Sequence, residues 1–558
     1  AAEEIMQQYI TAANRLYQRN MSRRANDAFK TYVPFSELVS LMFDLPGLKV
    51  SQERAESNAK KQYTQEVNPV IDVMALLCGM DTLKTAVVNR GNVLIKQDAE
   101  RTTIEGTMIA LENSTGYIDA LVGGSKYSNE NQFIRAVQAR LQPGSTFKPL
   151  YYSAAIDSKN FTMTTNISDT PVVFHKEDGS PYIPQDFKGK WEGDVPLWYA
   201  LAHSMNVPSL KVLDAIGFDA AIKRTSSLLG IPQNELSERH FEPVYPLGLG
   251  VCSVRPIELA KAFATFANNG KEVTPIAIRT VEDKNGNVIL NPEKDLRQSQ
   301  KQKGDKAQII SEETAFIMQE LLKKTVETGT LQYGANWDST YYVTGERKGR
   351  GNKFSYKTES GYTYTMPAAG KTGTTQNWAD AWTVGFTPYY TAAFWFGFDR
   401  PGQSLGLSIT GSTLAGVAWG DFMHVANEDK AFKNFREEAP EGLVELEVCS
   451  VSGGLLTEEC GEHKLTAYYY PGTEPTEYCQ KHTNTTLNTI GIMRLRNAQM
   501  QTGLSYNTAL LDTTPISFDL DFLSSDIPSS ERKKNEEDDE YSENINTDPD
   551  DFSNWLLE

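Results

Sequence analysis

The chain contains 558 residues, 40% of them hydrophobic, and carries a net charge of −18. This length suffices for about two to four domains with a sizeable core. The negative charge argues against a surface that binds duplex nucleic acid. No apolar run approaches the roughly 18 residues that a membrane-spanning helix needs.

Residues 1–104 contain a helical pattern from Ile5 to Arg19 but no recognisable chemical motif. We predict a linker or pedestal region there. The chain begins with Ala1 and shows neither an initiator methionine nor a signal segment, so we expect a fragment or a processed form. From residue 107 to 122, two apolar segments flank a short polar turn, which predicts a β-hairpin.

The next segment, Gln142–Pro149, reads Gln-Pro-Gly-Ser-Thr-Phe-Lys-Pro. It places Ser145 and Lys148 three residues apart at the predicted start of a helix, where they share one face. A lysine beside a serine can activate it as a nucleophile if the amine is held neutral. The alternative without chemistry is a serine that caps a helix with a surface lysine in its first turn.

Two further motifs follow along the chain. Ser204-Met205-Asn206 lies in a region of helical signals, and Lys371–Thr375 reads Lys-Thr-Gly-Thr-Thr where strand signals return. Apolar strands at 381–386 and 392–398 come next, and then a closing helix at 414–425. Strands, a helical insert, more strands and a helix predict an α+β architecture.

These motifs predict acyl transfer. Ser145 would attack a carbonyl group while Lys148 accepts its proton. Lys371 would supply a second cation that, with burial, keeps Lys148 neutral. Ser204 would relay the proton to the leaving group, and Asn206 would hold the substrate backbone.

The Lys-Thr-Gly segment is predicted to bind the substrate through Thr372, Gly373, Thr374 and Thr375. Gly373 would let an extended peptide approach the strand and pair with it. The hydroxyls of Thr372 and Thr374 would bind a terminal carboxylate. Backbone N–H groups of Ser145 and Thr374 would form the oxyanion hole, and this chemistry needs no metal or cofactor.

Other chemistries have less support. None of the six histidines has a metal-binding spacing, and the chain has no Walker-type phosphate loop. No Gly-x-Ser-x-Gly turn surrounds Ser145, although a serine-histidine-aspartate triad needs no local spacing. Asp380, at the start of a strand, is expected to form a turn rather than to act as a base.

The late cysteines leave two alternatives open. Cys449, Cys460, Cys479 and His482 could form a zinc site, but in a secreted protein a Cys460–Cys479 disulfide is favoured. The tail after Ser525 holds twelve acidic and three basic residues, half of the net charge. We predict that it is disordered.

Two other cysteines, Cys78 and Cys252, lie in apolar surroundings that are typical of buried free thiols.

The motifs resemble the transpeptidase domain of class A penicillin-binding proteins. The similarity rests on Arg135-Ala136 before the Ser145 segment, on Ala369–Thr375, on Asp380–Trp382 with Gly385–Pro388, and loosely on Pro471–Pro475. One departure is Ile134, where the family usually has asparagine. The resemblance implies a mostly antiparallel sheet covered by helices, as in the serine β-lactamases. It implies a transpeptidase domain at 105–430, a cysteine-containing extension at 431–515 and an acidic tail at 516–558.

The resemblance also implies a function. A serine D,D-transpeptidase cross-links peptidoglycan stem peptides that end in D-Ala-D-Ala, and β-lactams acylate the same serine. Such a protein works outside the cytoplasm, with a membrane anchor outside these residues and possible cell-wall assembly partners. The glutamate-bearing motifs of the family's glycosyltransferase domain are not found. The alternatives are a D,D-carboxypeptidase or β-lactamase using Ser145, and a non-catalytic β-lactam receptor or scaffold.

Overall fold

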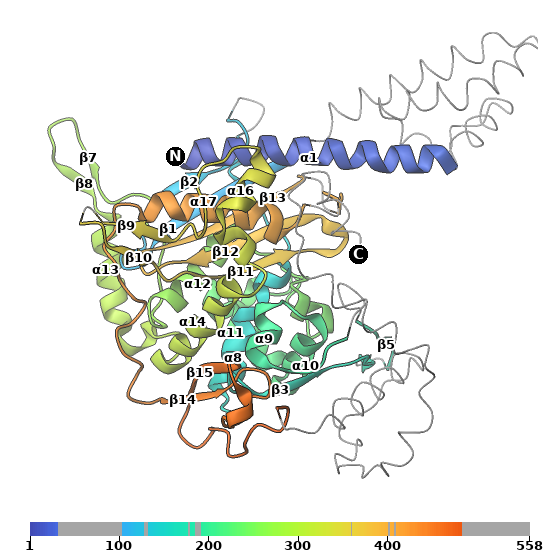
Figure 1. The fold of residues 1–558 in the computed structure, drawn as a ribbon. Coiled ribbons are helices and arrows are strands. Elements are labelled where there is room, and N and C mark those ends of the chain that lie inside the picture. The colour runs from blue at the N-terminus through green and yellow to red at the C-terminus, as the bar shows by residue number, and fades with distance from the viewer. Residues whose placement is uncertain are drawn as a thin grey trace, which may run out of the picture. The chain divides into compact units, whose positions relative to one another are not determined.

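Figure 1 shows a computed structural model of the chain. It describes residues 1–31, 103–127, 132–176, 179–184, 191–358, 360–399, 402–406 and 409–482, with backbone alone for 20–31. The described residues belong to one unit, Ala1–Gly503. Cys78, the tail at 516–558 and most of the predicted linker lie outside the described residues.

Five antiparallel strands form the central sheet in the order β11-β12-β13-β1-β2. The hairpin β1 (Glu105–Glu112) and β2 (Ile118–Val122) comes first in the chain. Strands β11 (Ala369–Thr374), β12 (Asp380–Phe386) and β13 (Tyr390–Gly397) complete the sheet after a long insert. β13 pairs with β1, so residues almost 300 apart in the chain are neighbours. The predicted α+β fold with a mostly antiparallel sheet is confirmed.

Helices cover both faces of the sheet. Side chains alternate between the two faces along each strand, and both faces carry apolar side chains that the helices bury. On one face, Leu111 and Trp382 pack with α8 (Lys148–Asp157), α12 (Pro256–Ala267) and α14 (Glu312–Glu327). Ser311 caps α14 by accepting a hydrogen bond from the Thr314 N–H.

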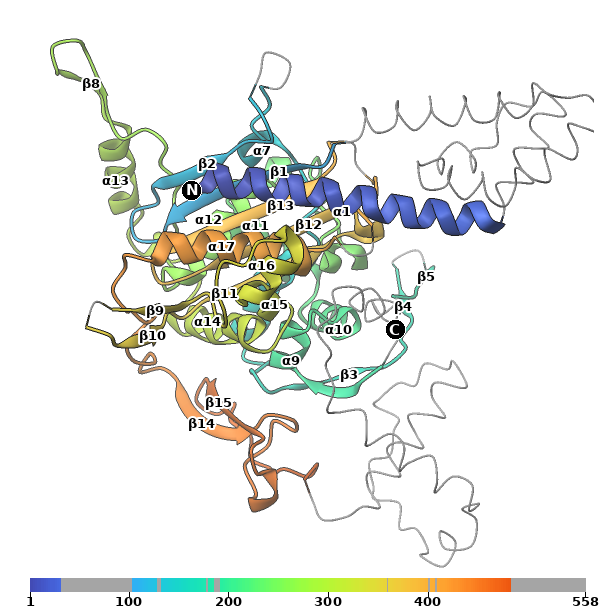
Figure 2. The same cartoon turned by 45° about the horizontal axis from the view of Figure 1, so that its top comes forward.

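On the other face, residues such as Phe394 pack with α1 (Ala2–Thr31) and α17 (Gly416–Asn427). Figure 2 shows these two helices on the same side of the sheet. α1 lies close to β1 at Gly106, where a Cβ would come within 2.9 Å of Met6 and Ile10. The first turns of α1 therefore contribute to the hydrophobic core, because Met6 and Tyr9 are fully buried.

The remaining elements position the site and its surroundings. The helices are α7 (Arg135–Gln138), α9 (Leu197–Ala202), α10 (Asn206–Ile216), α11 (Phe218–Leu229), α13 (Pro292–Lys303), α15 (Gln332–Ala335) and α16 (Trp337–Thr344). Short helical turns are η2 (Gly144–Phe147), η3 (Gln233–Glu235), η4 (Tyr245–Leu249), η5 (Gly304–Ala307), η6 (Gln376–Trp378), η7 (Gly411–Ala415) and η8 (Glu458–Cys460). Two-stranded sheets pair β3 (Asn166–Asp169) with β6 (Gly193–Pro196), β4 (Phe174–His175) with β5 (Pro181–Tyr182), β7 (Val281–Glu282) with β8 (Val288–Leu290), β9 (Ser355–Lys357) with β10 (Thr363–Thr365), and β14 (Val444–Cys449) with β15 (Lys464–Tyr469).

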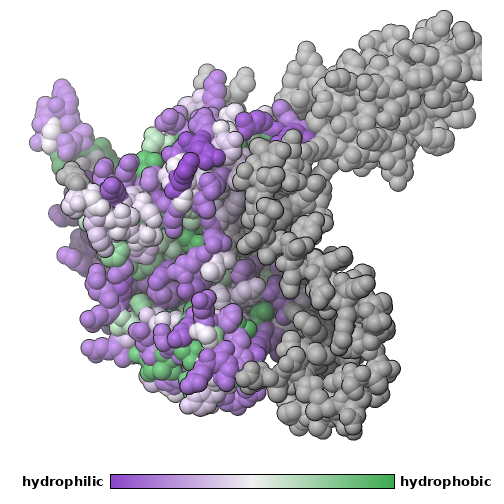
Figure 3. Space-filling view, in the orientation of Figure 1, coloured by the Kyte–Doolittle hydropathy of each residue, from purple (hydrophilic) through white to green (hydrophobic). Residues whose placement is uncertain are grey.

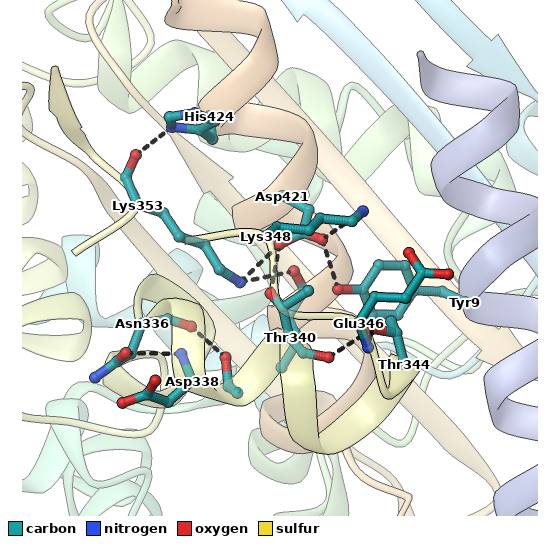
Figure 4. A network of polar contacts seen from close by, with 12 residues as sticks. Tyr9, Asn336, Asp338, Thr340, Thr344, Glu346, Lys348, Lys353, Asp421 and His424 are labelled. Atoms are coloured by element: carbon teal, nitrogen blue, oxygen red, sulfur yellow. Dashed lines mark hydrogen bonds and ion pairs between the residues drawn. The ribbon is translucent and has the colours of Figure 1, made fainter. Parts of the chain in front are cut away.

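A buried ion pair joins segments that are far apart in the chain (Figure 4). Lys353 Nζ lies 2.9 Å from the Asp421 carboxylate, and both side chains are almost fully buried. Tyr9 and Thr340 donate hydrogen bonds of 2.8 and 2.7 Å to the same carboxylate. α1, α16 and α17 therefore meet at Asp421.

The environment of this pair shifts both pKa values. Burial lowers the pKa of Lys353 to about 8, against the attraction of Asp421. Burial alone would raise the pKa of Asp421, but Lys353, Thr340 and Tyr9 more than offset it, so this pKa is lowered. The carboxylate therefore remains charged within the core.

The surface and the late hairpin complete the fold. The face seen in Figure 3 is mostly hydrophilic, with small hydrophobic patches. Among the described helices, none combines the length and apolar character that crossing a membrane requires. The four described cysteines are free thiols, so the Cys460–Cys479 disulfide favoured from the sequence is not formed here. Cys252 is buried, as the sequence predicted.

Candidate active site

Ser145 lies in the short 3₁₀ turn η2, and α8 begins at Lys148 rather than at Ser145 as the sequence predicted. In a 3₁₀ turn, residues i and i+3 lie directly above one another. Ser145 and Lys148 therefore still share one side. Ser145 lines a pocket together with Asn206, Thr374 and Thr375.

Backbone contacts hold the turn against the sheet. Gly144 has a φ of +55°, and a Cβ there would lie 3.1 Å from the Thr374 carbonyl oxygen. The Trp382 indole donates a 2.8 Å hydrogen bond to the Gln142 carbonyl. The position of Ser145 is thus set by β11 and β12, which come more than 220 residues later.

The amine of Lys148 is fully buried and connects the first two motifs. Its Nζ donates to the carbonyl oxygens of Ser204 (2.7 Å) and Met205 (3.1 Å). It also donates to the Asn206 side-chain oxygen at 2.9 Å. These contacts hold the Lys148 amine against the Ser204-Met205-Asn206 segment.

Ser204 occupies a junction between two helices. Its φ is +60°, in the left-handed region that non-glycine residues rarely adopt. α9 ends at Ala202 and α10 begins at Asn206, so the strained residue lies between them. Such strain persists only where surrounding contacts impose it, and here it directs the Ser204 carbonyl to Lys148.

Lys371 lies in β11 and is fully buried. Burial, with added repulsion from the nearby Lys148, lowers the pKa of Lys371 well below its ordinary value. Its Nζ donates a 3.0 Å hydrogen bond to the Thr372 carbonyl. Two amines thus share a site in which a second positive charge is costly.

At Gly373 the protein's own atoms lie close to β11. A Cβ at Gly373 would lie 2.6 Å from the Pro143 carbonyl oxygen and 2.9 Å from a Thr146 methyl group. On the other face of β11, Gly411 of η7 lies against the Gly373 backbone. A substrate can therefore reach Gly373 only along the free edge of β11, which is the first strand of the sheet.

The three threonine hydroxyls of the third motif differ. Thr372 is buried, and its hydroxyl is 2.6 Å from that of Thr330. Thr375 donates to Asp380 Oδ2 at 2.7 Å and accepts from the Asp380 N–H, so its proton is already used. Thr374 accepts a 3.0 Å hydrogen bond from the Gly411 N–H, which leaves its hydroxyl hydrogen able to donate into the pocket.

Several residues at the site were missed in the sequence. Leu249, Val251 and Trp378 line the pocket, and Trp382 anchors the nucleophile turn. Thr330 supports Thr372 from the segment after α14. Trp382 belongs to the Asp380–Trp382 segment, which was noted only for its resemblance. Leu249, Val251, Trp378 and Thr330 belong to no local motif, because tertiary contacts alone bring them to the site.

Comparison with known proteins decides the family. Residues 106–411, more than half of the chain, match the penicillin binding protein transpeptidase domain. The chain belongs to this family. Residues 439–484 match the C-terminal domain of penicillin-binding protein 1A. The family resemblance read from the motifs is confirmed.

Individual relatives agree with this assignment. The chain is 30% identical over 376 residues to penicillin-binding protein 1A of Aquifex aeolicus, covering 67% of this chain and 45% of that protein. Penicillin-binding protein 1A of Neisseria gonorrhoeae is 32% identical over 344 residues, covering 61% and 38%. The chain therefore spans less than half the length of these relatives.

A solved structure shares the fold. The crystal structure of penicillin-binding protein 1A from Haemophilus influenzae aligns with a TM-score of 0.55 and 24% sequence identity. The alignment covers 67% of this chain and 54% of that chain.

Proposed function

We propose that this protein is a serine D,D-transpeptidase that forms an acyl-enzyme on Ser145. The observation that carries the proposal is the buried Lys148 amine, one turn after Ser145 and bonded to Ser204 and Asn206. Ser145 Oγ would attack the carbonyl of the penultimate D-alanine. The bond to the terminal D-alanine would break, and an amine of a second stem peptide would then displace the enzyme.

The proton of Ser145 needs a neutral amine to accept it. Burial and repulsion from Lys148 lower the pKa of Lys371, so two positive charges side by side are disfavoured at this site. We assign the base role to Lys148, which shares the turn with the nucleophile. Its Nζ donates three hydrogen bonds here, which is the protonated form, so it would act as base after releasing one of these protons. Lys371 would place a second amine at the strand, and Ser204 would relay the proton to the leaving amine.

Substrate recognition follows from the edge of β11. A stem peptide that pairs with this edge would bring its terminal carboxylate to the Thr374 hydroxyl, which can donate to it. The backbone N–H groups of Ser145 and Thr374 would stabilise the oxyanion. Asn206 lines the same pocket and would orient the peptide.

The transpeptidase and the hydrolase alternatives differ in the molecule that accepts the acyl group from Ser145. Water as acceptor would make the protein a D,D-carboxypeptidase or, with a β-lactam, a β-lactamase. The family assignment favours the amine. Activity outside the cytoplasm, β-lactam binding and contacts with cell-wall assembly proteins belong to the same proposal. A glycosyltransferase activity is neither assigned to these residues nor excluded for a longer chain.

Labelling tests the nucleophile. A fluorescent penicillin should label the protein at Ser145 alone, and the Ser145→Ala variant should lose all labelling. Ser204→Ala is the matched control: it should react more slowly, by about 100-fold or more, with the adduct still on Ser145. An adduct mapped to Ser204, or full labelling of Ser145→Ala, would overturn the assignment. Mass analysis of products from a pentapeptide donor and an amine acceptor then tests transfer against hydrolysis.

A further inference from the structure

Four metal-binding side chains converge outside the acyl-transfer pocket. Cys449 ends β14, Cys460 ends η8, and Cys479 and His482 follow β15. One donor atom from each residue lies within 4.8 Å of the other three. We propose that these four residues form a closed structural zinc site.

The distances suit a tetrahedral ion. With Zn–S bonds of about 2.3 Å and Zn–N bonds of about 2.0 Å, neighbouring donor atoms lie about 3.5–3.8 Å apart. His482 Nδ1 lies 3.4 Å from the sulfur of Cys449 and 3.4 Å from that of Cys479. The most widely separated donors, which lie within 4.8 Å, would approach one another by up to about 1 Å to hold the ion.

A disulfide accounts for these residues less well. Any disulfide among three cysteines leaves one buried thiol and His482 without a role. Two backbone N–H groups also point at these sulfurs. The Ser452 N–H donates to Cys449 Sγ and the Thr457 N–H donates to Cys460 Sγ, both at 3.4 Å.

Three thiolates and one imidazole leave no open position for water or substrate, which indicates structural rather than catalytic zinc. The sulfurs are buried among a few apolar side chains, Val451 and Leu456. The loops that carry the cysteines have only this small cluster of their own, so a metal cross-link would stabilise them.

The site supports elements near the second motif. The Trp198 indole of α9 donates to the Ser450 carbonyl at 3.1 Å. Asn166 of β3 donates to the Ser452 carbonyl at 2.6 Å, and Lys481 donates to the Asp194 carbonyl of β6 at 2.8 Å. α9 ends two residues before Ser204. The loops that hold the proposed zinc therefore contact the helix that leads into the second motif.

Metal content tests the proposal without reference to activity. The full chain is reduced, incubated with zinc sulfate, dialysed against metal-free buffer and analysed by plasma mass spectrometry. The parent should retain about one zinc per chain, and a Cys449→Ser/Cys479→Ser variant less than about 0.2. Cys252→Ala removes a distant buried thiol and is the matched control, which should retain the parent's zinc.

Cobalt provides a second measurement that needs no variant. The reduced parent with cobalt in place of zinc should show the intense visible bands of a tetrahedral thiolate complex, which zinc should abolish. Less than about 0.2 zinc in the reduced parent, equal zinc in the double variant and Cys252→Ala, or an octahedral cobalt spectrum would each overturn the proposal. So would a Cys460–Cys479 disulfide in metal-free protein that stays oxidised when zinc and a mild reductant are added.

Discussion

The two buried amines, Lys148 and Lys371, differ in what surrounds them. Lys148 Nζ faces three oxygen acceptors, whereas Lys371 Nζ donates to its neighbour's carbonyl. Their charges are coupled, so replacing either one changes the proton affinity of the other. Variants that keep the charge but cannot release a proton distinguish the base from its partner.

Lys148→Arg should nearly abolish acylation. An arginine remains protonated and cannot accept the Ser145 proton, so the second-order rate constant with a β-lactam should fall by about 1,000-fold or more. Lys371→Arg keeps the second cation and should lose less, about 30-fold or less. Rates measured from pH 6 to 10, with thermal unfolding as a check of folding, test this difference. If the acylation rate constant instead collapses in Lys371→Arg and stays within tenfold of the parent in Lys148→Arg, the base is Lys371.

Thr374→Val should weaken recognition of a terminal carboxylate. A charged hydrogen bond contributes about 1.5–3 kcal/mol, so acylation by a donor with a free carboxylate should fall by about 10- to 150-fold. The same donor with a terminal amide should lose much less. Thr375→Val is the matched control: it disturbs the turn to Asp380 and should leave the carboxylate-to-amide rate ratio unchanged. Equal ratios in both variants would remove Thr374 from carboxylate recognition.

At the scale of elements, the nucleophile turn η2 and the strand β11 are packed backbone to backbone. Gly144 and Gly373 permit this contact from its two sides. A displaced turn would move Ser145 relative to Thr374, and a shift of about 1 Å can cost about 100-fold in rate.

Gly373→Ala should therefore impair catalysis more than stability. The new Cβ would meet the Pro143 carbonyl oxygen at 2.6 Å, so the turn must move. We expect acylation to fall by about 100-fold and stability by about 1–3 kcal/mol. Gly416→Ala is the control, since its Cβ first meets the flexible end of Leu331 at 3.0 Å, and it should stay within about 1 kcal/mol of the parent. Parent-like acylation in Gly373→Ala would show that the contact does not position Ser145.

Local patterns were enough to predict some elements of the fold. The β1–β2 hairpin, the strands β12 and β13 and the helix α17 follow from apolar periodicity and turn residues within a few residues of each element. The three motifs could be recognised because the residues of each motif lie within a few positions of one another in the sequence.

The rest depends on contacts that a local pattern does not encode. The 3₁₀ form of η2 depends on β11 and Trp382, and the contact of Gly373 depends on Pro143 and Gly411. The docking of α1 on the sheet depends on Gly106, about 100 residues later. Contacts between residues that are distant in the sequence thus determine these features, which apolar periodicity does not predict.

At the scale of the whole molecule, Asp421 links the first helix to the last part of the transpeptidase region. Its carboxylate accepts hydrogen bonds from α1 and α16 and pairs with Lys353. Lys348 lies 3.4 Å from the same carboxylate. Removing one member of a buried pair leaves the other charge uncompensated, which typically costs about 3–5 kcal/mol.

Asp421→Asn should therefore destabilise the protein at pH 7 by about that amount, and Lys353→Met added to it should restore part of the loss.

The pH dependence of this destabilisation is a more specific test of the Asp421 charge. Because the folded pKa of Asp421 is lowered, its contribution is complete above the unfolded value and is lost as pH falls through the folded pKa. The unfolding curves of parent and variant should thus converge as the pH falls below about 4. Asp338 is an exposed carboxylate on α16, and Asp338→Asn is the control. It should change the free energy of unfolding by less than about 1 kcal/mol throughout this pH range. A constant gap between parent and Asp421→Asn from pH 7 to 2.5 would show that the Asp421 charge does not contribute.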